Sequence, residues 1–457
     1  MNLEIMLLVS LSALLVMLNL VGVLIRSVRF QFAATLVVTL MLACLLFWMA
    51  SANLGLGFAG LLNVNVPSLF FAAIFTFGIL LCNLMGYSKD VQYSNFAVLS
   101  TFVLIGSYLV AFAGSLVTIF IGLELLGLST IFAALLGRRL AIEASVKLFI
   151  MSAVAIGLFS FGMVLVYGSV GSVALVNATK LYYLMLIALA VLAVSLSFDA
   201  ALFPFSLWVP DVFQGAPSHV TAMLGGVNKK VGFLALIEIM FFLFFAYKAY
   251  FMEIFYVLAI LSMFYGNLAA LMQRNVKRMI AYSSIGQAGY IAIGLAVAST
   301  YAIEGMLFHI FAHMLMFIGA MAVILFMEGR GRNEINDYIG LHKENWAVAL
   351  CFAVIMLSMI GTPLTMGFVG KFLLFSGAVY ANLLALALVG VVNSMISVYY
   401  YIKVISAMYT DKADARHLVV GRNVLAVMAV CTILIILLGV DPNLVLGIAR
   451  QASFYIT

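Results

Sequence analysis

The chain has 457 residues, of which 67% are hydrophobic and only 8% are charged, and its mean hydropathy is +1.26. So little charge over such a length excludes a water-soluble globular protein and predicts a chain that crosses a membrane many times. The formal net charge of +6 does not point to nucleic acid, because the basic residues stand in short segments between apolar runs.

Apolar runs of about 20 residues follow one another along the chain, and each is long enough to span a bilayer as a helix. They predict an all-α polytopic membrane protein with about fourteen spans and no soluble domain. The first run lacks a basic start and a small-residue cleavage site, so we expect a span rather than a removed signal peptide. The expected spans are roughly 4–25, 31–50, 67–86, 94–113, 115–137, 146–168, 181–203, 217–246, 250–272, 278–298, 302–326, 347–371, 382–409 and 423–440.

Lys and Arg gather in every second loop, and this asymmetry predicts the orientation of the chain. The basic residues of the odd-numbered loops are Arg26, Arg29, Lys89, Arg138, Arg139, Arg274, Lys277, Arg278, Arg330, Arg332, Lys343, Lys412, Arg416 and Arg422. The even-numbered loops hold only Lys180 and Lys248. Because positive loops stay in the cytoplasm, we expect both termini on the outer face of the membrane.

Proline interrupts two of the expected spans. The seventh ends in Phe203-Pro204, and the twelfth contains Gly361-Thr362-Pro363. Proline removes an intrahelical hydrogen bond, which is tolerated in lipid only where protein or water satisfies the freed groups. Broken helices at matching places in two halves of a chain point to a transport path, although two ordinary proline kinks remain the alternative.

Seven ionisable residues stand inside or at the edge of apolar runs. They are Glu124, Glu143, Lys147, Asp199, Lys229, Lys230 and Lys371. Each such residue near the bilayer centre costs roughly 2.5–3.5 kcal/mol on insertion scales. Several of them, with both signs present, indicate a buried polar path for ions or protons.

The two glutamates, Glu124 and Glu143, are open to different interpretations. Glu124 lies between apolar residues, so it is protonated, paired, or held in a static hydrogen bond between helices. Glu143 and Lys147 are four residues apart and can pair on one helix face. A surface salt bridge remains open for Glu143, whereas Lys147 lies deeper in its run.

The remaining lysines are candidates for a proton relay, since desolvation lowers the pKa of a lysine and a neighbouring carboxylate raises it. Lys229 and Lys230 are adjacent and point about 100° apart, so they cannot both face one cavity. Lys371 follows the proline break of the twelfth span. Its alternative role is to extend its amine to the membrane interface.

Two histidines, His309 and His313, are four residues apart on one face of the eleventh span. They suit a polar wire or hydrogen-bonded packing better than a metal site, because no third ligand stands nearby. His219, next to Pro217, stays ambiguous. The four cysteines (Cys44, Cys82, Cys351 and Cys431) have neither disulfide nor metal spacing, and no haem, flavin, iron–sulfur or nucleotide motif is present.

Four segments together carry a resemblance to a known family. Residues 203–217 read FPFSLWVPDVFQGAP, and the agreement continues through 143–147, 275–284 and 361–372. On these motifs the chain resembles the proton-translocating antiporter-like subunits, and most closely subunit N of complex I, clearly from about residue 90 to 410.

The resemblance implies fourteen helices with two inverted five-helix repeats and broken helices 7 and 12. It also implies a subunit without cofactors, in a complex whose other subunits carry the redox cofactors and the quinone site and oxidise NADH, reduced F420 or ferredoxin. Its partners would be other membrane subunits, a peripheral redox arm and the lipid of a prokaryotic plasma membrane. The expected divisions are an N-terminal segment 1–90, a first repeat 91–246, a second repeat 247–410 and a C-terminal helix and tail 411–457.

The resemblance also assigns roles in proton translocation. The family's fifth-helix glutamate corresponds to Glu124, its sixth-helix lysine to Lys147, its eighth-helix lysine to Lys229 and its twelfth-helix lysine to Lys371. Glu143, Lys230, His309 and His313 are secondary candidates.

One departure from the family concerns Asp199, which stands where the family usually has a lysine, while Ser206 replaces a histidine. Glu124 and Asp199 would then share one cavity, so one of them should stay protonated. We expect Lys230 to supply the missing positive charge by pairing with Asp199.

The leading interpretation is a proton-translocating subunit of a complex I-like quinone oxidoreductase. The alternatives are a subunit of a cation/proton antiporter or a membrane-bound hydrogenase, and a structural subunit whose first half-channel is impaired. A lipid-modifying enzyme is disfavoured, because the sequence has neither paired catalytic carboxylates nor a phosphate-binding loop.

Overall fold

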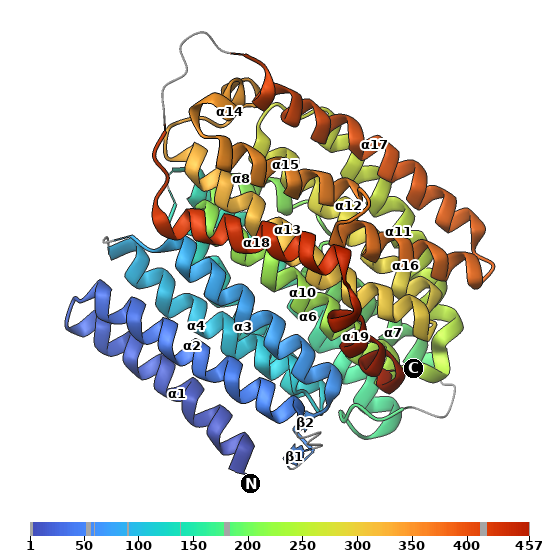
Figure 1. Ribbon diagram of the computed structural model, residues 1–457. Coiled ribbons are helices and arrows are strands. Elements are labelled where there is room, and N and C mark those ends of the chain that lie inside the picture. Colours follow the sequence, from blue (N-terminus) through green and yellow to red (C-terminus); the bar gives the residue numbers. More distant parts are fainter. Residues whose placement is uncertain are drawn as a thin grey trace.

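The computed structural model shows a bundle of helices that run mostly side by side (Figure 1). It describes residues 3–51, 56–58, 60–88, 91–137, 139–177, 183–411 and 418–456. The loop residues Lys89, Arg138, Lys180, Lys412 and Arg416, which enter the expected charge asymmetry, lie outside these ranges.

Helices make up almost all of the described structure, because a backbone in lipid must satisfy its hydrogen bonds within each segment. The helices are α1 (Leu3–Leu24), α2 (Val28–Ser51), α3 (Val66–Gly86), α4 (Val91–Ala111), α5 (Leu116–Ala134), α6 (Arg139–Val170), α7 (Tyr183–Asp199), α8 (Val209–Gly215), α9 (Ser218–Met223), α10 (Lys229–Ile237), α11 (Lys248–Leu271), α12 (Val276–Val297), α13 (Thr300–Glu328), α14 (Leu341–Glu344), α15 (Trp346–Ile360), α16 (Met366–Tyr380), α17 (Leu384–Tyr409), α18 (Arg422–Val440) and α19 (Asn443–Ile456). The other elements are the π-helical turns η1 (Leu224–Asn228) and η2 (Glu238–Leu243), the 3₁₀ turns η3 (Phe245–Tyr247) and η4 (Ile335–Tyr338), and the antiparallel strands β1 (Leu56–Phe58) and β2 (Leu62–Val64).

Within the described ranges, 11 helices are long and apolar enough to cross a membrane, and α7, α15 and α16 are shorter apolar helices. The all-α, multi-pass class is therefore confirmed. The expected count of fourteen stays a prediction, because the eighth and twelfth expected spans are each divided among several elements.

The two proline breaks lie closer to the buried charges than the sequence indicated. Helix α7 ends at Asp199 rather than at Phe203, and Ala201 takes a left-handed conformation with φ 55°. Helix α15 ends at Ile360, and Gly361 caps it with φ 98°, a conformation that glycine adopts without strain. Each break therefore leaves helix ends beside an ionisable side chain.

Helices α12 and α13 form the centre of the bundle. Of the most apolar stretch of each, 94% of α12 and 89% of α13 is buried, whereas only 22% of α6 is. A helix that is apolar on all sides belongs inside the protein, and small residues allow its neighbours to approach. A Cβ atom on Gly266 of α11 would lie 2.3 Å from the backbone nitrogen of Gly286 of α12.

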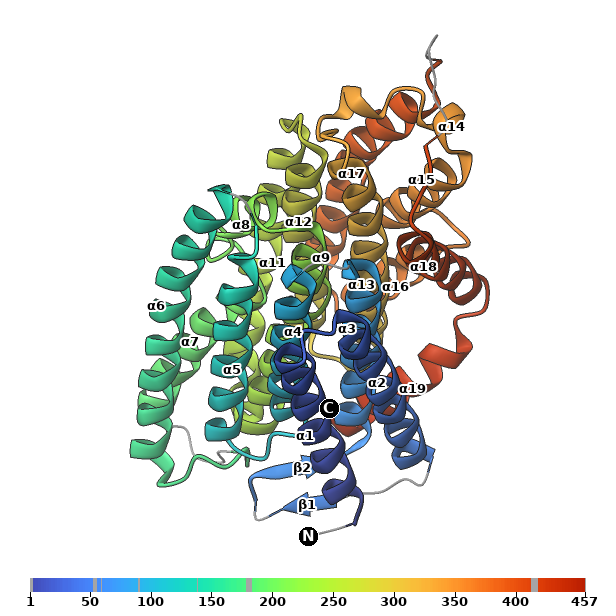
Figure 2. The ribbon, with the colours of Figure 1, turned by 90° about the vertical axis from the view of Figure 1, so that its left-hand side faces the viewer.

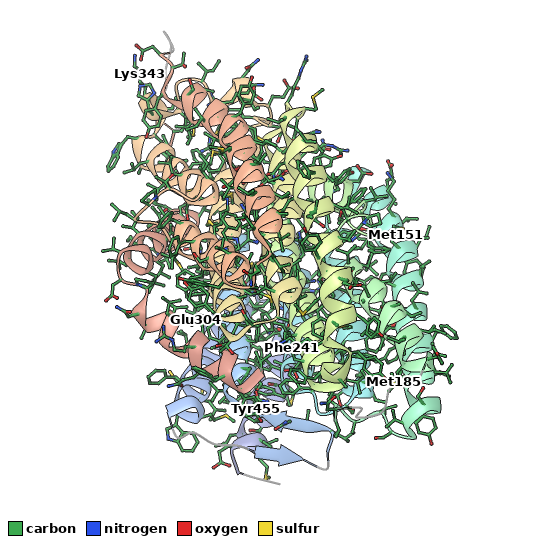
Figure 3. All side chains as sticks on the ribbon, turned by 90° about the vertical axis from the view of Figure 1, so that its right-hand side faces the viewer. Met151, Met185, Phe241, Glu304, Lys343 and Tyr455 are labelled. Carbon is green, nitrogen blue, oxygen red and sulfur yellow. The ribbon has the colours of Figure 1, made fainter. Side chains whose placement is uncertain are left out.

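The bundle has two distinct ends. Strands β1 and β2 and the ends of α1 and α19 lie at one end, and α14 lies at the other (Figure 2). We call the first end the terminal face and the second the loop face. Lys343 of α14 and Tyr455 of α19 mark these opposite ends in Figure 3.

Candidate functional site

The carboxylate of Glu124, on α5, is near enough to Asp199, the last residue of α7, for its charge to act on that residue. Helix α5 packs closely on α4 because Gly122 has no side chain. A Cβ atom at this position would stand only 2.8 Å from the carbonyl oxygen of Gly106. Both carboxylates are half-buried, and the charge of Glu124 acts on Asp199. Two acids in one region match the departure from the family that the sequence shows.

A small cavity joins Asp199 to the first central lysine. It measures about 30 Å³ and is lined by Asp199, Lys229, Asn228 and Thr130 among others. Asn228 donates a hydrogen bond to Thr130 across it. Glycine permits this arrangement, since a Cβ atom on Gly232 would lie 2.8 Å from the Asp199 Cβ. The lining is otherwise largely apolar, and its few polar side chains are enough to hold one or two waters.

Lys229 and Lys230 contact different helices, as their angular separation predicts. The Lys229 amine donates to the carbonyl oxygen of Ser284 at 2.9 Å and to its hydroxyl at 3.1 Å. The Lys230 amine contacts Nδ1 of His313 at 2.6 Å and the Gly225 carbonyl oxygen at 3.1 Å. The expected pairing of Lys230 with Asp199 is therefore wrong, because α10 directs Lys230 towards α13 and not towards α7.

Helix α10, which carries both lysines, is flanked by the π-helical turns η1 and η2. Such turns hold one extra residue and are frequent at functional sites. Both lysines are only 1% exposed. The local irregularity therefore coincides with the least exposed lysines among the described residues.

The two histidines extend the line of polar groups from Lys230. Nε2 of His309 lies 3.0 Å from the side-chain oxygen of Gln287, and the Gln287 amide donates to the Met359 carbonyl oxygen at 3.1 Å. Nδ1 of His309 and Nε2 of His313 are buried without a hydrogen-bond partner. Ordered water satisfies such groups in many proteins, and it would join the two rings. The described residues contain no group of three His, Cys, Asp or Glu able to hold a metal.

Lys371 completes the line at the break between α15 and α16. Its amine donates to the carbonyl oxygens of Met359 and Ile360, both at 2.9 Å, and to the Ser394 hydroxyl at 3.0 Å. It also lies 4.5 Å from the ring centroid of Tyr290. The carbonyl groups freed by the break are thus satisfied by the lysine, which is 4% exposed. Lys371 is held inside the protein and does not extend to an interface.

Lys147 and Glu143 lie on the surface of the chain, away from this line. Lys147 bonds Glu143 at 2.8 Å and Asp211 at 2.9 Å, and its side chain is 46% exposed. Arg278 donates to Asp211 at 2.9 Å. The expectation that Lys147 lies deep is wrong for the isolated chain, because hydropathy does not reveal which side of a span faces its own bundle.

Asp211 at the centre of this surface cluster is held ionised. Partial burial opposes its charge, but the hydrogen bonds from Lys147 and Arg278, together with their charges, outweigh that effect. The pKa of the Asp211 carboxyl therefore lies below its ordinary value.

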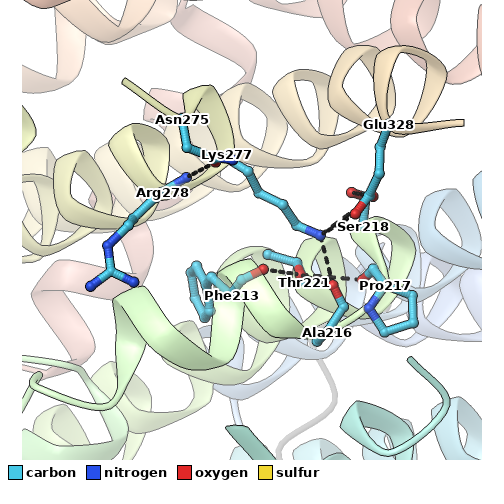
Figure 4. Close-up of polar contacts among 9 residues, drawn as sticks. All are labelled: Phe213, Ala216, Pro217, Ser218, Thr221, Asn275, Lys277, Arg278 and Glu328. Atoms are coloured by element: carbon cyan, nitrogen blue, oxygen red, sulfur yellow. Dashed lines mark hydrogen bonds and ion pairs between the residues drawn. The ribbon is translucent and has the colours of Figure 1, made fainter. Parts of the chain in front are cut away.

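Lys277 and Glu328 form an ion pair at the loop face that the sequence did not single out (Figure 4). The Lys277 amine lies 3.2 Å from Glu328 and donates to the Ala216 carbonyl oxygen at 2.6 Å. The Ser218 hydroxyl donates to the same carboxylate. This arrangement ties the start of α12 and the end of α13 to the segment before the central lysines.

Two buried glutamates also escaped the sequence analysis, although both stand in apolar runs as Glu124 does. Glu238 opens η2, is 4% exposed and has no charged partner among the described residues. Glu304 of α13 is equally buried and contacts Arg450 of α19 at 3.4 Å. An ionisable residue inside an apolar run is the pattern that identified the other buried charges, and it would have identified these two glutamates as well.

Broken helices beside a buried line of lysines, histidines and carboxylates define a membrane subunit of the ion-translocating type. Residues 113–397 match the family described as NADH:quinone oxidoreductase/Mrp antiporter, transmembrane, and the chain belongs to this family. The predicted membership is therefore confirmed.

Relatives of known description support the N type. The chain is 36% identical to NADH-quinone oxidoreductase subunit N of Trichlorobacter lovleyi, over 77% of this chain and 75% of the relative. It is 35% identical to the subunit of the same description from Rhodospirillum rubrum, over 79% and 77%. The expected resemblance to subunit N of complex I is confirmed.

Solved structures share the fold. A chain of respiratory complex I from Thermus thermophilus with bound Aureothin superposes with a TM-score of 0.84 at 29% identity, covering 96% of this chain and 98% of that chain. A chain of the Mrp complex from Dietzia sp. superposes with a TM-score of 0.92, covering 100% and 98%, but at 19% identity it shows the fold alone.

Proposed function

We propose that this chain is a proton-translocating, N-type membrane subunit of a complex I-like quinone oxidoreductase. In this proposal it carries no redox cofactor, and other subunits of the complex hold the quinone and the electron carriers. Family membership and the subunit N relatives support the complex. The buried line of ionisable groups supports the role in proton movement.

The observation that carries the proposal is the sequence of contacts through the middle of the bundle. Lys229 bonds Ser284 of α12, and Lys230 bonds His313 of α13. From His309 the contacts continue through Gln287 to the Met359 carbonyl oxygen, to which Lys371 also donates. The lysines and histidines of this line can take up and release a proton, whereas Gln287 and the Met359 carbonyl oxygen only hold His309 and Lys371 in place. Water between the titratable groups would carry the proton from one to the next, and an excess charge at one end favours its transfer.

Protons enter near Lys229 in this proposal, cross the line and leave by way of Lys371. Glu124 and Asp199 feed the entrance through the small cavity that Asp199 shares with Lys229. The loop face is cytoplasmic and the terminal face is the outer one, because the basic loops of the sequence belong to the loop face.

The experiment uses the purified complex in sealed vesicles, driven by NADH and a short-chain quinone, with a pH-sensitive dye reporting proton uptake. The variant Lys371→Ala removes the last amine of the line. We expect electron transfer in the presence of an uncoupler to persist and the proton-to-electron ratio to fall.

Two outcomes would contradict the proposal. An unchanged ratio in Lys371→Ala excludes the role of the line, and a ratio that depends on sodium rather than protons favours an antiporter-like subunit. The variant Lys403→Ala, on α17 and outside the line, is the matched control and should leave the ratio unchanged.

A further inference from the structure

Helix α19 lies over the terminal ends of the central helices, where neither the sequence nor the family resemblance assigned a function. It packs against α13 and α3. Tyr455 of α19 also contacts Phe242 of η2, with ring centroids 6.2 Å apart. Glu304 of α13 lies on this side of the molecule, towards Tyr455 (Figure 3).

Among the described residues, one ion pair joins α19 to the helix beneath it, between Arg450 of α19 and Glu304 of α13. Both guanidinium contacts measure 3.4 Å. The Glu304 side chain is 5% exposed, whereas that of Arg450 is 62% exposed. A nearly enclosed carboxylate thus touches a cation that is open to water.

A cavity connects Lys371 with polar groups nearer to this pair. It measures about 630 Å³, and Lys371, Ser376, Tyr380 and Ser394 are among its lining residues. Most of its lining is apolar and exposed on the isolated chain, as Phe372, Leu388 and Met395 are, so a flanking subunit has to cover it and exclude lipid. Once covered, the Lys371 amine and the two serine hydroxyls are the polar partners that water needs there.

Tyr301 joins the cavity to the ion pair. Its ring packs against Tyr380 with centroids 5.6 Å apart. The Ser376 side chain and the charges of Glu304 and Arg450 all act on the Tyr301 hydroxyl. Polar groups therefore follow one another from Lys371 to the exposed guanidinium of Arg450.

We propose that Glu304 is the proton acceptor of an outlet at the terminal face, and that Arg450 of α19 positions its carboxylate. This inference rests on the proposed function. The Lys371 ammonium gives its proton to water in the cavity, and the Ser376 and Tyr301 hydroxyls pass a proton on to the Glu304 carboxylate. Glu304 then releases its proton to water at the terminal face and returns to its pairing with Arg450.

The test compares Glu304→Gln with wild type in the same vesicle assay. The share of proton uptake that Lys371→Ala removes defines the contribution of this subunit. We expect Glu304→Gln to lower this share by about tenfold or more, since the amide has the same size but cannot accept the proton. Glu304→Asp should retain most of it, and Glu253→Gln, an exposed glutamate of α11, should retain all of it.

A purely structural role for the ion pair makes a different prediction. If Glu304 and Arg450 only anchor α19, the double variant Glu304→Met with Arg450→Met keeps the helix docked and restores uptake. If Glu304 carries the proton, the double variant retains its thermal unfolding midpoint but not its uptake.

The outcomes separate this inference from the proposed function. Normal uptake in Glu304→Gln, with a clear loss in Lys371→Ala, overturns the outlet alone. Normal uptake in Lys371→Ala overturns the proposed function itself. Restored uptake in the double methionine variant also overturns the outlet.

Discussion

A Cβ atom on Gly370 would lie 2.5 Å from Nδ1 of His309. Glycine at this position lets α16 approach α13 closely, and the residue after it is Lys371. The distance between the last lysine and the histidine line is therefore set by the absence of a side chain.

The variant Gly370→Ala should separate α16 from α13. We expect a loss of stability of about 1–3 kcal/mol, because overpacking forces the neighbouring side chain or backbone to move. We also expect a lower proton-to-electron ratio, since Lys371 moves with its helix. Thermal unfolding of the purified complex and the vesicle assay measure the two effects.

A matched control for this variant is Gly157→Ala in α6, where a Cβ atom meets nothing within 4 Å. Alanine is the better helix former there, so stability should stay the same or rise. Equal effects of the two substitutions would show that the contact with His309 is unimportant.

The variant Glu328→Gln should destabilise the loop face. It leaves the Lys277 amine, which is 3% exposed, without its counter-charge. We expect a loss of about 2 kcal/mol, less than for a fully buried pair because Glu328 is 35% exposed. The measurement is the thermal unfolding midpoint.

The comparison for Glu328 is the exposed pair of Lys343 with Asp411, 2.7 Å apart. Lys343→Ala should change stability by less than about 1 kcal/mol. A similar small change in Glu328→Gln would contradict a structural role for the buried pair.

Asp211→Asn should make stability less dependent on pH. The folded-state pKa of Asp211 lies below its ordinary value, so its ionisation stabilises the fold at neutral pH. The difference between wild type and variant should be complete at neutral pH, begin to shrink below about pH 4 and vanish below the folded-state pKa. Unfolding midpoints recorded from pH 7 downwards measure it, and a constant difference would count against the pairing.

The variants Lys229→Met and Glu124→Gln test whether the first half-channel carries protons or whether the chain is a purely structural subunit. We expect Lys229→Met to lower proton uptake strongly, because it removes the amine that links the Asp199 cavity to Ser284. Glu124→Gln should lower it less, since Asp199 remains beside Lys229. A structural subunit would tolerate both substitutions in the vesicle assay.

The class of the protein and both helix breaks could be predicted from the sequence. The length of an apolar run and the position of a proline are local properties of the sequence. They therefore predicted a helix break at Gly361 with Lys371 shortly after it, without any knowledge of how the helices pack. The membrane-spanning character and the subunit N resemblance rest on the same local patterns, and both are confirmed.

The partners of the buried charges could not be predicted, because they depend on which helices pack together. Lys230 bonds His313, which is 83 residues away, rather than Asp199. Lys147 was expected to be deep, yet it faces outward, since hydropathy averages over all sides of a helix. Glu304 stands in an apolar run and could have been identified from the sequence, but its pairing with Arg450 depends on how α19 packs on α13.

The π-helical turns at both ends of α10 have a geometric consequence. Each inserts one surplus residue, so the nine residues of α10 are offset by one position from an uninterrupted helix. One position corresponds to a rise of about 1.5 Å and a turn of about 100°. If η1 were wound as an α-helix, without room for its surplus residue, Lys229 would stand at the place of Lys230 beside His313, so the π-helical turn decides which of the two adjacent amines meets the imidazole.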